Sequence, residues 1–166
     1  MKRIYEGQAW VVGDHINTDQ ILPGRYLDRP MADVGQYAMT GLDETFPQKV
    51  RPGGFVVAGV NFGCGSSREA AVMALKQAGV AAVIARSFGR IFFRNAINNG
   101  FPAAVVAETE RITHGDPLRL DLETRTLTDL RTGEVFTLQN LSGISQQILA
   151  AGGIVPFTLA RLEARR

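Results

Sequence analysis

Cysteine is almost absent from this chain: Cys64 is the single one among 166 residues. One cysteine excludes an intramolecular disulfide, and it excludes a zinc or iron–sulfur site built from the cysteines of this chain alone. Any iron–sulfur chemistry would have to be brought by a partner. A chain without disulfides is typical of a reducing compartment, so we expect a cytoplasmic protein.

Long apolar runs are also missing. The runs that exist are short and broken by glycine or charge, far below the roughly 20 residues of a membrane-spanning helix. The first ten residues include Lys2, Arg3 and Glu6, so they predict no apolar signal-peptide core. We therefore expect no contact with a membrane.

An excess of one charge is lacking too. Lys and Arg together number 18 and Asp and Glu 16, which gives a net charge of +2 in a chain that is 20% charged. This excess is too small for a dedicated nucleic-acid-binding protein, which needs a concentrated basic face. A hydrophobic content of 45% excludes a disordered chain. The length fits one domain, residues 1–166, which can bury roughly 70% of its unfolded surface.

Strand-like and helix-like patterns alternate through the first two thirds of the chain. They predict strands at 4–12, 55–60, 80–85 and 103–107 and helices at 67–78 and 88–98. This alternation implies right-handed crossovers and a parallel sheet. Residues 14–51 are irregular, with one short helix expected near 32–40. A stretch of this length inside a compact domain is usually functional or disordered, and its many apolar residues argue against disorder.

The pattern changes after residue 108. Short alternating segments at 118–122, 126–130 and 134–138 predict an antiparallel meander, followed by helices at 144–151, with Ser142 as its cap, and at 155–164. The predicted fold class is therefore α/β, with a mainly parallel central sheet flanked by helices and a small C-terminal antiparallel meander.

The segment NFGCGSSRE, residues 61–69, is the sharpest chemical feature. It joins a predicted strand to a predicted helix, and its two glycines allow close approach of the backbone to a ligand. We expect Ser66 and Ser67 at the helix N-terminus, which attracts anions, and Arg68 adds a fork suited to a carboxylate or phosphate. The alternative is a serine that only caps the helix beside a solvated Arg68. No Gly-Lys-Ser/Thr ending is present, so this is not a Walker loop.

Two further polar segments follow predicted strands. In GDHINTD, His15 and Asp19 can orient a substrate or a group of a partner, or the segment is a cluster of Asx turns with a surface histidine. In SFGRIFFRN, Arg90 and Arg94 are expected to share one helix face, where they bind an anion, form ion pairs or face solvent.

Three separated motifs resemble the small subunits of 3-isopropylmalate dehydratases, and equally the swivelling domain of aconitase-type hydro-lyases. The motifs are GDHINTDQILP at 13–23, NFGCGSSREAA at 61–71, and ARSFGRIFFRNAINN at 85–99 followed by GFP. The resemblance covers essentially the whole chain. It implies an aconitase-type swivelling β/β/α domain and the small subunit of a hydro-lyase that isomerises a hydroxy diacid by dehydration and rehydration. The reaction it suggests interconverts 3-isopropylmalate and 2-isopropylmalate in leucine biosynthesis.

The resemblance also implies roles for individual residues. In this family a [4Fe–4S] cluster on the large subunit acts as a Lewis acid, and a serine of the swivelling domain removes the proton from carbon. By the matching motif that serine is Ser66. Ser67 and Arg68 match residues that hold a substrate carboxylate, and Asp19 matches an orienting aspartate of the active site. This chain would then bind no cofactor or metal itself and would be inactive without its large subunit, in a heterodimer or heterotetramer.

The specificity loop that follows the first motif departs from the family pattern. Isopropylmalate-type subunits carry Tyr-Leu and a short apolar pair, whereas homoaconitase-like subunits carry Tyr-Leu-Arg, whose arginine reads an extra carboxylate. Here Tyr26 and Leu27 are followed by Asp28 and Arg29. We expect Leu22, Tyr26 and Leu27 to form an apolar wall for a branched alkyl group. Asp28, facing inward or paired with Arg29, would then exclude extended diacids. If Arg29 faces the substrate instead, it binds the extra carboxylate and homoaconitate-like acids are accepted.

Several alternatives stay open at this point. Homoaconitate, citramalate and 2,3-dimethylmalate are the other candidate substrates. A reading from a different class is a free-standing anion- or nucleotide-binding α/β module that uses residues 63–68 as its cradle. The near-neutral charge argues against RNA binding. Co-purification with a brown, oxygen-sensitive large chain would separate the enzyme subunit from the binding module.

Overall fold

The computed structural model describes residues 3–141 and 143–166. Its strands are β1 (Ile4–Val11), β2 (Phe55–Val57), β3 (Ala82–Ala85), β4 (Ala103–Val105), β5 (Pro117–Asp121), β6 (Thr126–Asp129) and β7 (Val135–Thr137). Its α-helices are α1 (Thr18–Ile21), α2 (Phe46–Lys49), α3 (Glu69–Gln77), α4 (Arg90–Asn98), α5 (Gly143–Ala151) and α6 (Ile154–Glu163). Short 3-10 helices are η1 (Gly24–Tyr26), η2 (Met31–Tyr37) and η3 (Thr109–Arg111).

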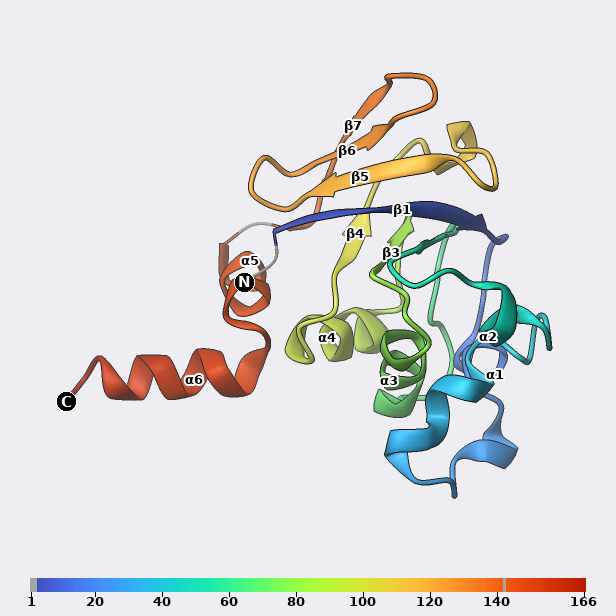
Figure 1. The fold of residues 1–166 in the computed structure, drawn as a ribbon. Helices are drawn as coiled ribbons and strands as arrows, with labels where there is room; N and C mark the ends of the chain where they lie inside the picture. The colour runs from blue at the N-terminus through green and yellow to red at the C-terminus, as the bar shows by residue number, and fades with distance from the viewer. Residues whose placement is uncertain (1–2, 142) are drawn as a thin grey trace.

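Within the described ranges, seven strands form one sheet in the order β4-β3-β2-β1-β5-β6-β7. Strands β1 to β4 pair in parallel, and β1 also pairs antiparallel with β5, from which β6 and β7 continue the meander. Figure 1 shows β5, β6 and β7 stacked above β1, with α3 and α4 below the parallel strands. The α/β prediction is confirmed, and β1 is the strand that joins the parallel and antiparallel parts.

Alternate residues of the central strands enter two hydrophobic cores on opposite faces of the sheet. Val56 and Val83 belong to the first core, which includes residues of α1, η2 and α3. Phe55 and Ile84 point to the other face, into the second core with apolar residues of β5, β6, β7 and α5. Both faces of β2, β3 and β4 are therefore covered, which explains why these three strands are uniformly apolar in sequence.

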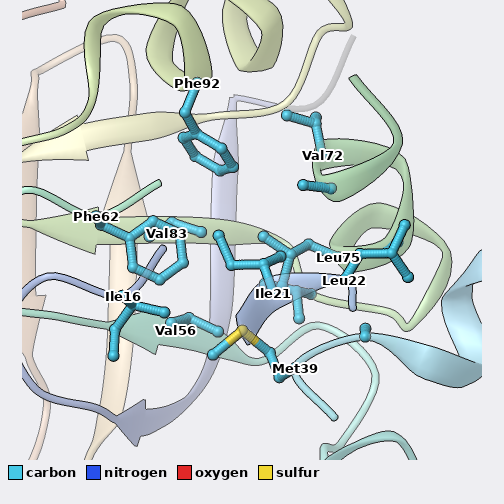
Figure 2. Packing of buried hydrophobic residues seen from close by; sticks show 14 of the residues in the cluster. Ile16, Ile21, Leu22, Met39, Val56, Phe62, Val72, Leu75, Val83 and Phe92 are labelled. Atoms are coloured by element: carbon cyan, nitrogen blue, oxygen red, sulfur yellow. The ribbon is translucent and has the colours of Figure 1, made fainter. Parts of the chain in front are cut away.

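The irregular segment 14–51 is fixed to the first core. Ile21, Leu22 and Met39 are each at most 1% exposed, and Figure 2 shows them packed together with Leu75 of α3. The short helix expected near 32–40 is present as η2, a 3-10 helix. The prediction that Leu22 forms part of an apolar wall for the substrate is wrong, because its side chain is buried in the first core.

Helix α3 begins two residues later than predicted. Its N-cap position is Arg68, which has an extended backbone and makes no side-chain capping bond. Ser66 and Ser67 therefore lie in the loop before the helix, and their predicted place at the helix N-terminus is wrong. Tertiary hydrogen bonds explain the difference: Gly63 N donates to Ile16 O at 2.7 Å, and Thr18 N donates to Cys64 O at 2.9 Å. These bonds fix the loop through Cys64, and the extended backbone of Arg68 lets the helix begin only at Glu69.

The last two helices follow the meander. The predicted cap of α5, Ser142, lies outside the described residues. Figure 1 shows α6 extending away from the rest of the molecule toward the C-terminus. In the described part of the chain, no single helix has the length and apolar character to cross a membrane, and α5 and α6 meet that measure only as a pair bent by 92°.

Candidate functional site

The three sequence motifs meet at the carboxyl ends of β1, β2 and β3. Parallel strands end at the same edge of a sheet, which is where such sheets carry their ligand sites. Beyond the strands, the backbone pairing continues in irregular form, with isolated bridges between Asn17 and Cys64 and between Phe62 and Phe88. Segments that are far apart in sequence are therefore locked together along one edge.

Arg68 is the residue that ties the second motif to the first. Its Nη1 donates to Asp19 Oδ1 at 3.2 Å and to the carbonyl oxygen of Leu22 at 3.1 Å. The side chain is 18% exposed, so the alternative of a solvated arginine is wrong. Its Nε and Nη2 atoms hydrogen bond to no residue in the described ranges. The anchored guanidinium thus keeps free donors for an incoming carboxylate.

Asp19 is held as an ionised carboxylate. Its Oδ1 accepts a hydrogen bond from Gly24 N at 2.8 Å as well as the one from Arg68. The Gly24 bond, followed by the Arg68 bond, lowers the pKa of Asp19. A carboxylate with a lowered pKa is a poor proton acceptor at neutral pH but a good anchor for a guanidinium. The geometry therefore suits Asp19 to orienting Arg68.

Ser66 and Ser67 lie in the loop beside this anchored pair. Both residues are exposed, and neither hydroxyl hydrogen bonds to another residue of the described chain. The loop rests on α1, since a Cβ added at Gly65 would lie 3.4 Å from Thr18 Oγ1. The two hydroxyls are therefore presented at the surface next to Arg68, available to a ligand that binds there.

A second set of polar contacts joins the loops that follow the three strands. Asp14 Oδ1 accepts from the backbone N–H after β2 at 2.8 Å and from Arg86 Nη2 at 3.3 Å. Asn61 N donates to Ser87 Oγ at 2.8 Å, and the Asn61 amide nitrogen lies 3.3 Å from His15 Nδ1. Sequence reasoning missed Asp14, Arg86 and Ser87. The available signal was that each stands within two residues of the end of a predicted strand, where side chains converge.

The specificity loop is organised around two stacked tyrosine rings. Tyr26 and Tyr37 stack with ring centroids 3.9 Å apart and planes 7° from parallel. The Arg29 guanidinium lies 6.0 Å from the Tyr37 ring centre, and its Nε is 3.9 Å from Asp28 Oδ1. Leu27 is 45% exposed. Of the three residues expected to form an apolar wall, Tyr26 and Leu27 remain available.

The other two arginines expected to bind an anion do not belong to the Arg68–Asp19 pair. Arg90 and Arg94 are exposed on α4. In the described part of the chain, no group of three or more His, Cys, Asp or Glu side chains is arranged to hold a metal ion.

Comparisons with known proteins agree on one family. The family model for the aconitase C-terminal domain matches residues 18–106. The isopropylmalate/citramalate isomerase small subunit of Methanocaldococcus jannaschii is 48% identical over 160 residues, covering 95% of each chain. The 3-isopropylmalate dehydratase small subunit of Nautilia profundicola is 42% identical and covers 98% of this chain and 99% of its own. The homoaconitase small subunit of M. jannaschii is 43% identical, covering 95% of this chain and 93% of its own.

A solved structure agrees with these relatives. A 3-isopropylmalate dehydratase structure from M. jannaschii superposes with a TM-score of 0.92 at 42% identity, covering 98% of this chain and 97% of that one. The predicted aconitase-type fold and the predicted family are thereby confirmed.

Proposed function

Because this chain belongs to the family of 3-isopropylmalate dehydratase small subunits, with the aconitase C-terminal domain as its fold, we propose that, in complex with a large subunit, it interconverts 3-isopropylmalate and 2-isopropylmalate. The family membership supplies the hydro-lyase activity. We place the enzyme in the cytoplasm.

The observation that carries the proposal is the Arg68–Asp19 pair beside two exposed serines. The free Nε and Nη2 atoms of Arg68 suit one carboxylate of a diacid, and Ser67 Oγ can donate a further hydrogen bond to it. Asp19 and the Leu22 carbonyl hold the guanidinium in place before the substrate arrives. Binding then costs little reorganisation of the site.

Ser66 is the residue to which we assign proton transfer. Its Oγ, as an alkoxide, takes the proton from the carbon next to the one that bears the hydroxyl group, and the hydroxyl group departs to leave an alkene diacid. A proton is then added to the carbon that first bore the hydroxyl group, and a hydroxyl group is added to the neighbouring carbon, which completes the isomerisation. The Arg68 cation stabilises the negative charge of the alkoxide. We had expected the helix N-terminus to attract this negative charge, but Ser66 lies in the loop before the helix.

The Lewis acid must come from the partner. Cys64 is the single cysteine, whereas a [4Fe–4S] cluster is usually held by about four. When bound on the large subunit, the cluster supplies the Lewis acidity that draws off the hydroxyl group. This chain supplies the acid–base serine and the carboxylate-binding fork.

Reconstitution with the large subunit tests the proposal. Both chains are purified separately without oxygen, combined, and assayed with 3-isopropylmalate, citramalate, 2,3-dimethylmalate and homoaconitate. We expect the highest kcat/KM with 3-isopropylmalate. The small chain alone should have no activity and no stoichiometric iron. Full activity with bound iron in the absence of the large subunit would overturn the proposal, as would an inactive complex on every substrate.

A homoaconitate-type substrate is the second candidate. The 43% identity to a homoaconitase small subunit and the presence of Arg29 in the specificity loop favour it. The same panel of substrates decides between the two.

A further inference from the structure

Helices α4 and α5 border a groove of about 540 Å³ whose lining combines two cations with an apolar floor. Arg90 and Arg94 stand one turn apart on α4. Both are exposed, and neither forms an ion pair or a hydrogen bond with any residue of 3–141 or 143–166. Phe93, Ile97 and Ile148 line the groove with them. Two unpaired arginines around an apolar floor are typical of a protein-binding surface, where arginine and aromatic side chains are enriched.

The start of α4, where this groove begins, lies against the loop of the proposed active site. Gly89, the residue before Arg90, packs directly against the loop that leads to Ser66. A Cβ added at Gly89 would lie 2.8 Å from Gly63 O and 3.1 Å from Cys64 N. A partner that covers the Ser66 loop is therefore close to Arg90 as well.

The charge of the groove selects among possible occupants. A second copy of this chain offers α6, which has no buried residue, but Arg161, Arg165 and Arg166 outnumber Glu163 on this helix and the residues after it. Docking it here would bring arginine against arginine. An occupant that pairs with Arg90 and Arg94 must instead carry carboxylates, with an apolar side chain between them.

We propose that the groove lined by Arg90, Phe93 and Arg94 is a docking surface for the large subunit, which inserts an acidic segment with an apolar anchor. This inference rests on the proposed function, which supplies the partner. The carboxylates of the segment pair with Arg90 and Arg94, and its apolar side chain packs on Phe93. The contact holds the cluster-bearing subunit over the Ser66 loop.

Charge reversal tests the proposal. The double variant Arg90→Glu/Arg94→Glu is titrated against the purified large subunit by calorimetry without oxygen, at about 0.05 M and about 0.5 M salt. We expect Kd to rise by about tenfold or more at low salt, and the wild-type complex to weaken at high salt while the variant changes little. At a saturating concentration of the variant chain, kcat should stay near the wild-type value, because neither arginine belongs to the catalytic site.

Two further variants serve as controls. Arg51→Glu reverses an exposed arginine just before β2, at the opposite edge of the sheet from Ser66, and should leave Kd unchanged. Arg90→Lys/Arg94→Lys keeps both charges and should retain most of the affinity. Equal melting temperatures of the isolated chains establish that each variant folds.

The possible outcomes separate this inference from the proposed function. If the wild-type complex is active and the charge-reversed chain binds with wild-type affinity, the docking surface is wrong and the proposed function stands. If charge reversal dissociates a homodimer of this chain without weakening the large-subunit complex, the groove is a contact between copies and the inference is overturned. If the wild-type chain neither binds nor activates the large subunit, both fall.

Discussion

Asp116 and Asp129 form a buried carboxyl pair at the start of β5 and the end of β6. Their exposed fractions are 3% and 1%. Arg131 Nε donates to Asp116 Oδ1 at 2.6 Å, and this contact lowers the pKa of Asp116 to about 2. Burial raises the pKa of Asp129, and the neighbouring Asp116 carboxyl raises it further. Two carboxylates this close repel each other when both are ionised, so the raised pKa of Asp129 and the lowered pKa of Asp116 favour a proton on Asp129 rather than on Asp116.

This pair predicts a specific dependence of stability on pH. A carboxyl group with a raised pKa in the folded state contributes stability below its unfolded pKa of about 3.9, and that contribution is lost as pH rises through the folded value. In Asp129→Asn, the neutral amide can still donate a hydrogen bond to Asp116. Because the amide does not ionise, the loss of stability at high pH is removed. Its Tm at about pH 8 should therefore equal or exceed that of the wild-type chain.

Asp116→Asn is the matched control in the same pair. The lowered pKa of Asp116 contributes stability above about pH 3.9 that is lost as pH falls toward 2. At neutral pH this variant should lose about 1–2 kcal/mol, because Arg131 loses its charged acceptor. Thermal melting between about pH 2 and pH 8 measures both effects. A clear drop in Tm for Asp129→Asn at the high end of this range would contradict the assignment of the proton.

The second prediction concerns Ser66. Ser66→Ala should lower kcat by about a hundredfold or more in the reconstituted complex and change KM much less, as expected for loss of an acid–base group. Thr158→Ala removes an exposed hydroxyl on α6 and should leave both constants unchanged. Steady-state kinetics with 3-isopropylmalate measure the split. Near-full turnover in Ser66→Ala would show that another group removes the proton.

The third prediction tests whether Asp19 acts through Arg68. Asp19→Asn loosens the anchor and Arg68→Lys replaces the fork by a point charge, so each should raise KM by about tenfold. If Asp19 works by positioning Arg68, the double variant should be little worse than Arg68→Lys alone. Additive losses in this double-mutant cycle would mean that Asp19 contacts substrate independently.

The fourth prediction concerns Gly63, where space and backbone conformation both require glycine. Gly63 has φ +81°, and an added Cβ would collide with the Phe92 ring. Gly115 has φ +89° with nothing within 4 Å, so Gly115→Ala isolates the backbone effect and should cost about 1 kcal/mol. Gly63→Ala should cost about 1–3 kcal/mol more and lower activity, because the Ser66 loop must shift. Equal melting temperatures of the two variants would argue against the collision.

The fold was largely predictable, because it rests on local patterns. Apolar runs of strand length, helical spacing and period-two alternation located the sheet, its crossovers and the meander. The start of α3 was not predictable, because Ser66 and Ser67 are favourable capping residues while the loop is set by nonlocal bonds such as Gly63 N to Ile16 O. At this position, nonlocal hydrogen bonds determine the backbone conformation more strongly than the local preference of serine for a helix cap.

The candidate site shows the same division. The motif at 61–69 indicated an anion-binding arginine, but its anchor, Asp19, lies 49 residues away and could be paired with it only once the strands were in place. Leu22 was misjudged for a related reason. In a segment without periodicity, nothing in the sequence distinguishes an apolar residue that faces a ligand from one that faces the core.

The last prediction concerns the choice of substrate, which depends on the loop that carries Asp28 and Arg29. Burying an isopropyl group is worth about 1.5–2 kcal/mol, so an apolar wall formed by Tyr26 and Leu27 discriminates weakly. An arginine that pairs with an extra carboxylate discriminates more strongly. Arg29 lies instead near the Tyr37 ring and beside Asp28, with 54% of its side chain exposed.

Two variants of this loop separate the possibilities. If Arg29 does not reach the substrate, Arg29→Ala should leave the ratio of kcat/KM for 3-isopropylmalate and homoaconitate within about threefold of wild type. Asp28→Arg places an arginine directly after Tyr26-Leu27, as homoaconitase-like subunits have it, and should shift this ratio toward homoaconitate by about tenfold or more. Both ratios are measured in the complex with the large subunit. A wild-type preference for homoaconitate that is lost in Arg29→Ala would overturn the assignment of 3-isopropylmalate. It would also identify Arg29 as the specificity residue, because Arg29 would then have to leave its position near the Tyr37 ring and contact the substrate.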